Sequence, residues 1–329
     1  MAAKSSTCKS NYCRYLPFFN LSDAEFNAVI GNWSYDFDPD LDIFNILPNP
    51  DKFDDKDPDN MLNCPHSNYY SLNQLNQLFD STTSKCLSIF QCNIRSLPKN
   101  LSLLSEFLHS VNRKPDILAV TETRLSTRTV TNVDIFNYDF FHTNSPTQAG
   151  GSGLYISKNL NAIHRPDLKF SKPLVESSWC EIISGNARPN IIVGCIYRHP
   201  TCNLSAFTSE FETLLKEISQ YEIYILGDFN IDLLKYSEHL LSEEYVNMLY
   251  SNNLLPLITK PTRLTHHTST LIDHIYTNSN LSVDAGIALV DISDHLPVFC
   301  ILDRQISRFR RVSYFRDYSN FDVDQYTVY

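Results

Sequence analysis

The stretch Ile223-Tyr-Ile-Leu-Gly-Asp-Phe-Asn230 decides the fold class of this chain. Its first four residues are strand formers, and the glycine and polar residues after them are typical of the point where a buried strand ends. Side chains two residues apart in a strand point the same way, so Asp228 and Asn230 should reach one spot if the backbone stays extended through Phe229. The same Gly-Asp-x-Asn pattern is also typical of an Asx turn that only closes a strand.

Strands and helices alternate in the rest of the chain. An apolar run over residues 86–92 ends at Asn93, a three-four spacing of leucines predicts a helix over residues 101–111, and a second apolar run over residues 116–121 ends at Glu122. This order indicates the α/β class. Further strands are expected at residues 138–143, 153–156, 178–184, 191–197, 271–276, 286–290 and 298–302, and further helices at residues 207–218 and 243–251.

A length of 329 residues suits one large domain or two ordinary ones. The periodic segments place the domain over residues 85–304. Residues 1–84 are predicted to form an acidic, partly disordered N-terminal arm, with a short helix near residues 21–30 and a linker with a second short helix at residues 67–81. Residues 305–329 are predicted to be a C-terminal tail with a small basic group.

The charge is distributed unevenly along the chain. The net charge is −10, of which residues 1–80 carry −7 (12 Asp and Glu against 5 Lys and Arg) and residues 81–329 carry −3 (25 against 22). Binding of a polyanion normally leaves a basic footprint on a protein. The nearly balanced domain therefore neither excludes nor favours a nucleic acid as substrate.

The nine cysteines are an odd number, and five of them lie in apolar, strand-like runs. They are Cys86, Cys92, Cys180, Cys195 and Cys300. This indicates buried free thiols in a reducing compartment rather than a disulfide framework. The start of the chain lacks a signal-peptide pattern, and the sequence has no apolar run long enough to cross a bilayer. We therefore expect a protein that is neither secreted nor bound in a membrane.

Polar residues recur just beyond the predicted strands. They are Asn93, Glu122, Tyr197, Asp228 with Asn230, and Asp294 with His295. A sheet protein gathers the residues at its strand ends into one rim. Each of these residues alone is typical of a cap or a turn, but acids, amides, a phenol and an imidazole together suit hydrolysis of a phosphate ester with a divalent ion. Mg²⁺ prefers oxygen ligands and needs only one or two carboxylates from the protein.

Several segments of the chain match the motifs of a known family. The chain resembles the endonuclease/exonuclease/phosphatase superfamily, and within it the apurinic-type endonuclease domain of non-LTR (LINE-like) retrotransposons. The matching segments occur in the family's order within residues 85–302. They are Gln91-Cys-Asn-Ile-Arg-Ser-Leu97, Leu118-Ala-Val-Thr-Glu-Thr-Arg-Leu125, Gly150-Gly-Ser-Gly-Leu-Tyr-Ile156, Ile192-Val-Gly-Cys-Ile-Tyr-Arg-His-Pro200, Leu226-Gly-Asp-Phe-Asn230, Thr270-Leu-Ile-Asp-His-Ile-Tyr-Thr-Asn278 and Ile292-Ser-Asp-His-Leu-Pro-Val298.

The resemblance implies an α+β four-layer sandwich of the DNase I-like type, with two mixed β-sheets face to face, outer helices and the site at one rim. It implies an enzyme that nicks one strand of double-stranded DNA with Mg²⁺ or Mn²⁺ and leaves a 3′-hydroxyl for target-primed reverse transcription. Such an activity implies a nuclear location. LINE proteins also carry a reverse transcriptase, for which this chain has no room, so the resemblance implies a fragment or a degenerate copy.

The resemblance also implies roles for individual residues. Glu122 matches the main metal carboxylate, with Asn93 beside it and Asp294 as a second carboxylate on the metal side. Asp228 matches the residue that orients or deprotonates the attacking water, and Asn230 matches a donor to the phosphate.

The remaining roles that the resemblance implies concern the phosphoryl oxygens of the substrate. His295 would stabilise charge on them, and Asp273 would hold the His295 ring, as a carboxylate does for a catalytic imidazole. Tyr197 would contact the phosphate. Thr262 and Ser293 match supporting positions.

Two positions depart from the family pattern, Arg124 where tryptophan is common and His199 where proline is common. Both could change contact with DNA, although neither removes a catalytic group. Other functions stay open from the sequence. They are a catalytically inactive retroelement remnant that acts only as a binding module, an abasic-site repair nuclease, and a phosphomonoesterase of the same fold.

Overall fold

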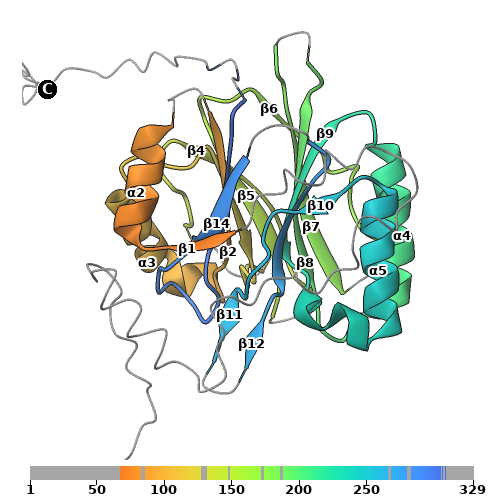
Figure 1. Cartoon of the computed structure of the whole chain (residues 1–329). Helices are drawn as coiled ribbons and strands as arrows, with labels where there is room; N and C mark the ends of the chain where they lie inside the picture. The colour runs from red at the N-terminus through yellow and green to blue at the C-terminus, as the bar shows by residue number, and fades with distance from the viewer. Residues whose placement is uncertain are drawn as a thin grey trace, which may run out of the picture.

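The computed structural model describes residues 67–82, 86–126, 132–146, 149–171, 174–185, 188–265, 268–279 and 283–304, together with residues 306 and 308. The helix predicted near residues 21–30 and most of the predicted basic tail lie outside the described residues. Two β-sheets stand face to face in the centre, and helices lie on both outer sides (Figure 1).

The two sheets are both mixed. The seven-stranded sheet has the order β1 (Asn68–Tyr70), β14 (Val283–Ala288), β15 (Val298–Leu302), β2 (Leu87–Asn93), β3 (Ile117–Thr121), β5 (Ser152–Ser157) and β4 (Tyr138–Thr143). The six-stranded sheet has the order β10 (Leu255–Pro256), β13 (Asp273–Thr277), β9 (Glu222–Asp228), β8 (Ile191–Arg198), β7 (Val175–Ile182) and β6 (Ala162–His164). A short hairpin of β11 (Arg263–Leu264) and β12 (Ser269–Thr270) projects at one rim (Figure 1).

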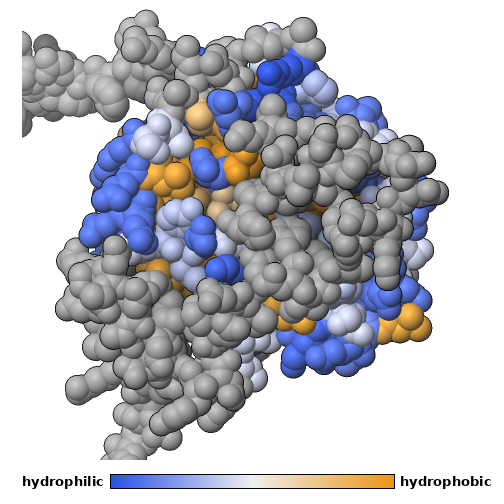
Figure 2. Space-filling view, in the orientation of Figure 1, coloured by the Kyte–Doolittle hydropathy of each residue, from blue (hydrophilic) through white to orange (hydrophobic). Residues whose placement is uncertain are grey.

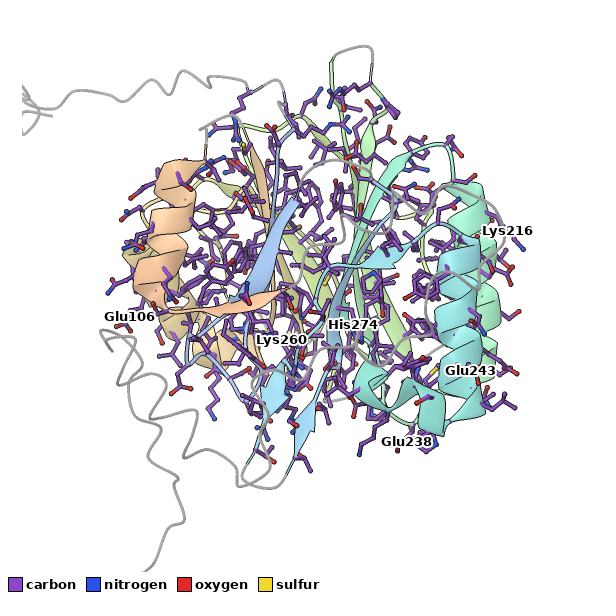
Figure 3. The ribbon with its side chains drawn as sticks, in the orientation of Figure 1. Glu106, Lys216, Glu238, Glu243, Lys260 and His274 are labelled. Atoms are coloured by element: carbon purple, nitrogen blue, oxygen red, sulfur yellow. The ribbon has the colours of Figure 1, made fainter. Side chains whose placement is uncertain are left out.

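Helices form the two outer layers. They are α2 (Leu72–Ser81) and α3 (Leu97–Ser110) over the seven-stranded sheet, and α4 (Leu204–Glu217), the 3₁₀ segment η4 (Leu233–Glu238) and α5 (Leu240–Ser251) over the six-stranded sheet (Figure 1). The visible outer surfaces of these helices are mostly hydrophilic (Figure 2). Glu106, Lys216 and Glu243 lie on their outer sides, whereas His274 lies inside (Figure 3). The predicted four-layer α/β sandwich of the DNase I-like type is confirmed.

Alternation along β2 explains how the fold builds its site. Leu87 and Ile89 face the core between the sheets, whereas Phe90 and Cys92 face the core beneath α2 and α3. Because successive strand residues alternate between faces, Asn93 at the end of β2 lies on the inter-sheet side with Leu87 and Ile89. The strand therefore delivers a polar side chain to the rim between the two sheets.

The N-terminal linker expected at residues 67–81 is part of the sandwich. β1 pairs in parallel with β14, Ser71 caps α2 through a capping box with Gln74, and Leu75 is fully buried. The sequence did not indicate this because a three-residue strand has no detectable periodicity, and its partner lies some two hundred residues away. We propose that the folded domain begins at or before residue 67 rather than at residue 85.

The five cysteines predicted to lie outside disulfides are buried and form no disulfide bond among the described residues, and the same holds for Cys202. Within the described chain no helix is both long and apolar enough to span a bilayer.

Candidate active site

The ends of five strands meet at one rim between the sheets. Parallel β2 and β3 end together at Asn93 and Thr121, so that Glu122 follows directly. In the opposite sheet, Asp228 lies beside Tyr197 of β8 on one side and beside Asp273 of β13 on the other. Residues from distant parts of the chain are therefore brought to one place by the strand registers.

Asn93 connects the two sheets across this rim. Its Nδ2 donates to Asp228 Oδ2 at 2.8 Å and to Glu122 Oε1 at 3.2 Å. The side chain is almost fully buried, so these bonds fix its orientation. Ser293 Oγ donates to the Asn93 carbonyl and accepts from the backbone N–H of His295, which places the loop before β15 against the same strand end.

Asp273 and His295 form a buried pair. His295 Nδ1 lies 2.7 Å from Asp273 Oδ2. Thr262 Oγ1 donates to the same oxygen at 2.8 Å, and Gln91 Nε2 donates to Asp273 Oδ1 at 3.2 Å. These bonds orient the carboxylate, and the carboxylate in turn orients the imidazole.

The environment shifts the pKa of both reactive groups upward. Burial raises the pKa of Asp228 from 3.8 to about 7, and the neighbouring charge of Asp273 adds to this effect. Burial opposes protonation of His295, but the charges of Asp273, Asp228 and Asp294 outweigh it and raise the His295 pKa to about 9. Between pH 7 and pH 9 the site therefore holds an Asp228 carboxylate beside a His295 imidazolium.

Strained backbone is concentrated at these strand ends. Seven described non-glycine residues have a positive φ, and five of them follow β2, β3 or β9. The five are Arg95, Ser96, Glu122, Arg124 and Asn230. Each such residue costs about 1–3 kcal/mol, so clustered strain of this kind marks a site whose geometry is held by its surroundings.

Asn230 lies at the site, but its backbone reaches it by a different path from the one that the sequence predicted. The prediction assumed an extended backbone, but β9 ends at Asp228 and Asn230 has a φ of 50°. The N–H of Asn230 donates to Asp228 Oδ1 at 3.0 Å, which is an Asx turn. The Asn230 side chain donates to the Arg198 carbonyl at 2.8 Å, so that this bond fixes it beside Asp228.

Tyr197 lies in the same row of the six-stranded sheet. Its side chain is buried, and burial with the charges of Glu122, Asp228 and Glu176 raises the pKa of its phenol well above the ordinary value. The phenol therefore stays protonated and can donate a hydrogen bond at any physiological pH.

Asp294 lies at the outer edge of the cluster. Its Oδ1 is 3.0 Å from Arg95 Nη1, and its Oδ2 is 2.8 Å from Arg263 Nη2. Burial raises the Asp294 pKa, but the charges of His295 and the two arginines outweigh it and lower the pKa. Both oxygens of the carboxylate proposed as a second metal ligand are therefore engaged by arginines.

The residues present fit a hard divalent cation. Asp228, Asp273 and His295 offer ligand atoms within 4.8 Å of one another, but the hydrogen bond between Asp273 and His295 suits proton handling better than metal binding. Glu122 offers the carboxylate oxygens that Mg²⁺ prefers, whereas Asn93 turns its amide nitrogen toward Glu122 and Asp228 and its oxygen toward the Arg95 N–H. The Glu122 side chain is 18% exposed, and its Arg124 partner at 3.1 Å is 37% exposed, so a cation can reach the carboxylate.

Sequence reasoning missed the supporting roles of Gln91, Arg95 and Arg263. Gln91 precedes Asn93 by two residues in β2, so strand alternation could have placed it on the same face. No sequence signal pairs Arg95 or Arg263 with Asp294, because the three residues come from separate loops. His274 follows Asp273 but faces away, and burial lowers its pKa to about 4, as for a neutral core histidine.

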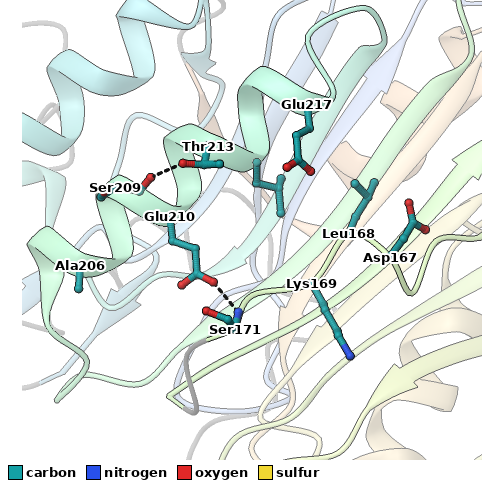
Figure 4. A pocket seen from close by; sticks show the side chains of 10 residues that line it. Asp167, Leu168, Lys169, Ser171, Ala206, Ser209, Glu210, Thr213 and Glu217 are labelled. Carbon is teal, nitrogen blue, oxygen red and sulfur yellow. Dashed lines mark hydrogen bonds between the residues drawn. The ribbon is translucent and has the colours of Figure 1, made fainter.

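A surface pocket beside α4 contains none of these residues (Figure 4). It is lined by Asp167, Leu168, Lys169, Ser171, Ala206, Ser209, Glu210, Thr213, Leu214 and Glu217. Glu210 accepts from the backbone N–H of Ser171. The candidate site at the strand-end rim therefore lies apart from this pocket.

The raised pKa values predict how stability depends on pH in the metal-free protein. The native state keeps protons on His295 and Asp228 at pH values where the unfolded chain has lost them, so stability falls as the pH rises. The His295 contribution is complete below pH 6.5 and is lost as the pH rises through about 9. A shift of this size corresponds to roughly 3 kcal/mol. The free energy of unfolding, measured with urea in EDTA at several pH values, should show this loss in the wild type but not in His295→Gln. Parallel plots of this free energy against pH for the two proteins would contradict the prediction.

Comparisons with known proteins agree with this arrangement. Residues 191–299 match the family model described as endonuclease-reverse transcriptase. An uncharacterised protein of Acanthamoeba polyphaga mimivirus is 29% identical over 102 residues, which is 29% of this chain and 20% of that protein. The chain thus spans about a fifth of the length of this relative.

Three solved structures share the fold. The endonuclease domain of TRAS1, a telomere-specific non-LTR retrotransposon, aligns with a TM-score of 0.52 at 13% identity over 67% of this chain and 99% of its own. The catalytic domain of Xenopus laevis APE2 aligns with a TM-score of 0.53 at 16% identity over 68% and 94%. The AP endonuclease LMAP from Leishmania major aligns with a TM-score of 0.55 at 14% identity over 76% and 100%. The shared fold confirms the predicted DNase I-like sandwich, and the family model matches the part of the chain over residues 191–299.

Proposed function

We propose that this chain is a divalent-metal-dependent phosphodiester hydrolase that nicks one strand of double-stranded DNA and leaves a 3′-hydroxyl. The observation that carries the proposal is the hydrogen-bonded connection of Glu122, Asn93 and Asp228 across the two sheets, beside the Asp273–His295 pair. A carboxylate for the cation, a base for water and a cationic imidazole are the three elements that hydrolysis of a phosphodiester needs.

Asp228 is the base in this proposal. Its pKa of about 7 lies near the pH at which the protein would work, which is where a general base is most effective. The Asn93 amide and the Asn230 N–H each hold one of its oxygens. The carboxylate is therefore fixed in orientation while it keeps lone pairs for a water molecule.

His295 and Tyr197 donate to the phosphate in this proposal. His295 uses Nδ1 for Asp273, and Nε2 has no hydrogen-bond partner among the described residues. Nε2–H is thus available for a phosphoryl oxygen, and the raised pKa keeps the ring charged. The protonated phenol of Tyr197 and the second N–H of the Asn230 amide are further donors on the other side of Asp228.

Mg²⁺ or Mn²⁺ would be held by the Glu122 carboxylate, and Asn93 would position that carboxylate through its amide N–H. When bound, such a cation supplies positive charge to the phosphate oxygens as a Lewis acid. Glu122 is held for this task by its own backbone, since its carbonyl accepts from the Ser96 N–H at 2.8 Å. Thr262 and Ser293 support the site without touching the phosphate, the first through Asp273 and the second through Asn93.

DNA as the substrate is supported by what the related structures are named for. TRAS1 is described as a telomere-specific non-LTR retrotransposon with an endonuclease domain, and LMAP as an AP endonuclease. If this chain acts on DNA, its place of action is the nucleus. By the same resemblance, the 3′-hydroxyl end would serve a reverse transcriptase as primer.

Nicking of supercoiled plasmid DNA tests the proposal. We expect the wild-type chain to produce open circles with Mg²⁺ or Mn²⁺ and none in EDTA. A DNA polymerase should extend the nicks, because their 3′ ends carry hydroxyl groups. Lys216→Ala is the matched control, since Lys216 is exposed on α4 on the outer face of the molecule and forms its ion pair with Glu212 of the same helix (Figure 3). It should nick like the wild type.

Failure of the wild type to nick with either metal would contradict the proposal and favour a non-catalytic binding module. A duplex with one abasic site is a second substrate for the same assay. Cleavage of the abasic duplex that exceeds nicking of intact duplex by orders of magnitude would identify a repair-type nuclease instead.

A further inference from the structure

Two exposed arginines flank Asp294 at the edge of the site. The Arg95 side chain is 55% exposed and the Arg263 side chain is 40% exposed, whereas the Asp294 carboxylate between them is only 15% exposed. Each arginine binds a different carboxylate oxygen, at 3.0 Å and 2.8 Å. The carboxylate thus lies behind two guanidinium groups that reach the solvent.

The charge around Asp294 disfavours a cation. Two guanidinium groups surround one carboxylate, and Asp273 balances the His295 imidazolium beside it, so the local net charge is positive. Glu122 differs, because only one exposed arginine pairs with it and its other oxygen accepts from a neutral amide. A divalent cation is therefore favoured at Glu122, and an anion is favoured at Asp294.

We propose that Asp294 is a positioning residue rather than a metal ligand, and that it holds Arg95 and Arg263 as a clamp for the phosphate backbone of double-stranded DNA next to the phosphate that is cut. This inference rests on the proposed function. In this proposal Asp294 is not the metal ligand that the resemblance implied. The two arginines provide a local basic surface for DNA, which the overall composition of the chain does not indicate.

Both arginines come from ordered backbone. Arg95 has a φ of 48°, and its N–H donates to Asn93 Oδ1 at 3.1 Å. Arg263 lies in β11, opposite Thr270 of β12. The neighbouring Thr262 carbonyl accepts from the Leu296 N–H at 2.8 Å, which ties this hairpin to the loop that carries Asp294. The clamp is therefore in place before DNA arrives, which lowers the entropy cost of binding.

Guanidinium groups suit this role for two reasons. Their planar donors match phosphate oxygens in pairs and keep their charge at every relevant pH. Each arginine gives one N–H to Asp294 and has further N–H donors on an exposed guanidinium group, so it can bind a phosphate while it keeps its bond to Asp294. Arg263 Nε is buried without a partner, which leaves a donor on the same group unused.

Binding of a fluorescent DNA duplex in EDTA tests the clamp without cleavage. Arg95→Ala and Arg263→Ala should each weaken binding by roughly five- to tenfold at moderate salt, and each should lower the slope of log affinity against log salt by about one. Lys216→Ala removes the same charge from the outer face and should change neither quantity. Arginine variants that bind like the Lys216→Ala control would overturn the clamp.

Binding of Mn²⁺ without DNA, followed by calorimetry, tests the role of Asp294. Asp294→Asn should bind Mn²⁺ within about twofold of the wild type, whereas Glu122→Gln should lose roughly tenfold or more. Equal losses in the two variants would make Asp294 a metal ligand and overturn the proposal. Neither assay depends on nicking, so an inactive wild type would remove the proposed function and leave both results readable. If Asp294→Asn fails to fold, the two arginine variants still decide about the clamp.

Discussion

Asp228→Asn is expected to lower the rate of DNA nicking by about 10²–10⁴-fold, the usual contribution of a general base. The variant removes the only group at this position that can take a proton from water near neutral pH. Single-turnover nicking of a labelled duplex in saturating Mg²⁺ measures the effect on the chemical step.

The same variant should keep its fold and its DNA binding. Asparagine can accept from Asn93 or from the Asn230 N–H through its one carbonyl oxygen, so one of the two hydrogen bonds survives. Its thermal unfolding should therefore stay close to that of the wild type. A variant that nicks within about threefold of the wild type would show that Asp228 is not the base.

Gly227→Ala is expected to destabilise the domain by roughly 4 kcal/mol or more, the combined cost of backbone strain and overpacking. Gly227 has a φ of 149°, a region that side-chain-bearing residues rarely adopt. An added Cβ would lie 1.8 Å from the Ile196 carbonyl oxygen of the neighbouring strand β8. The oxygen belongs to the backbone of β8 and the position of the Cβ is fixed by the backbone of β9, so neither atom can move without disrupting the pairing of the two strands.

Urea denaturation followed by circular dichroism measures this loss. Asp228→Asn, one residue further along the same strand, is the control and should unfold near the wild-type midpoint. Equal midpoints for Gly227→Ala and the wild type would show that β8 and β9 do not approach as closely as described here. The requirement for glycine thus explains one position of the Gly-Asp-Phe-Asn motif by packing and not by chemistry.

The sequence predicted most of the sandwich because its central strands are long and apolar. β2, β3, β8 and β9 are buried along almost their whole length, and each ends at a polar residue. A continuous apolar run that ends at a polar residue predicts a strand without any knowledge of the strands that pair with it. β1 could not be predicted in this way, because its place beside β14 depends on pairing between distant segments.

The sequence predicted which residues come together at the candidate site, but not the backbone conformation and the contacts that hold them there. Asn93, Glu122, Asp228 and His295 do converge, since strand ends of a sheet share a rim. The predicted extended backbone from Asp228 to Asn230 was wrong, because the Asp228 side chain accepts a hydrogen bond from the Asn230 N–H and the backbone forms a turn there. Hydrogen bonds between a side chain and the next turn of backbone compete with strand extension, and the sequence pattern fits both outcomes.

The partners of Asp294 were beyond the reach of the sequence. Its ion pairs join residues from the turn after β2, the hairpin strand β11 and the loop before β15. Only the assembled sandwich brings these loops together. The family resemblance assigns Asp294 the role of a metal ligand from its place in the sequence. The two arginines that pair with its carboxylate in the structure suit a positioning residue instead.

Anomalous diffraction from crystals grown with Mn²⁺ locates the cation on which the proposed hydrolysis depends. We expect an anomalous peak within coordination distance of the Glu122 carboxylate, next to Asn93, and no peak at Asp294. Manganese bound only at Asp294, or nicking-competent protein with no manganese at Glu122, would contradict this expectation.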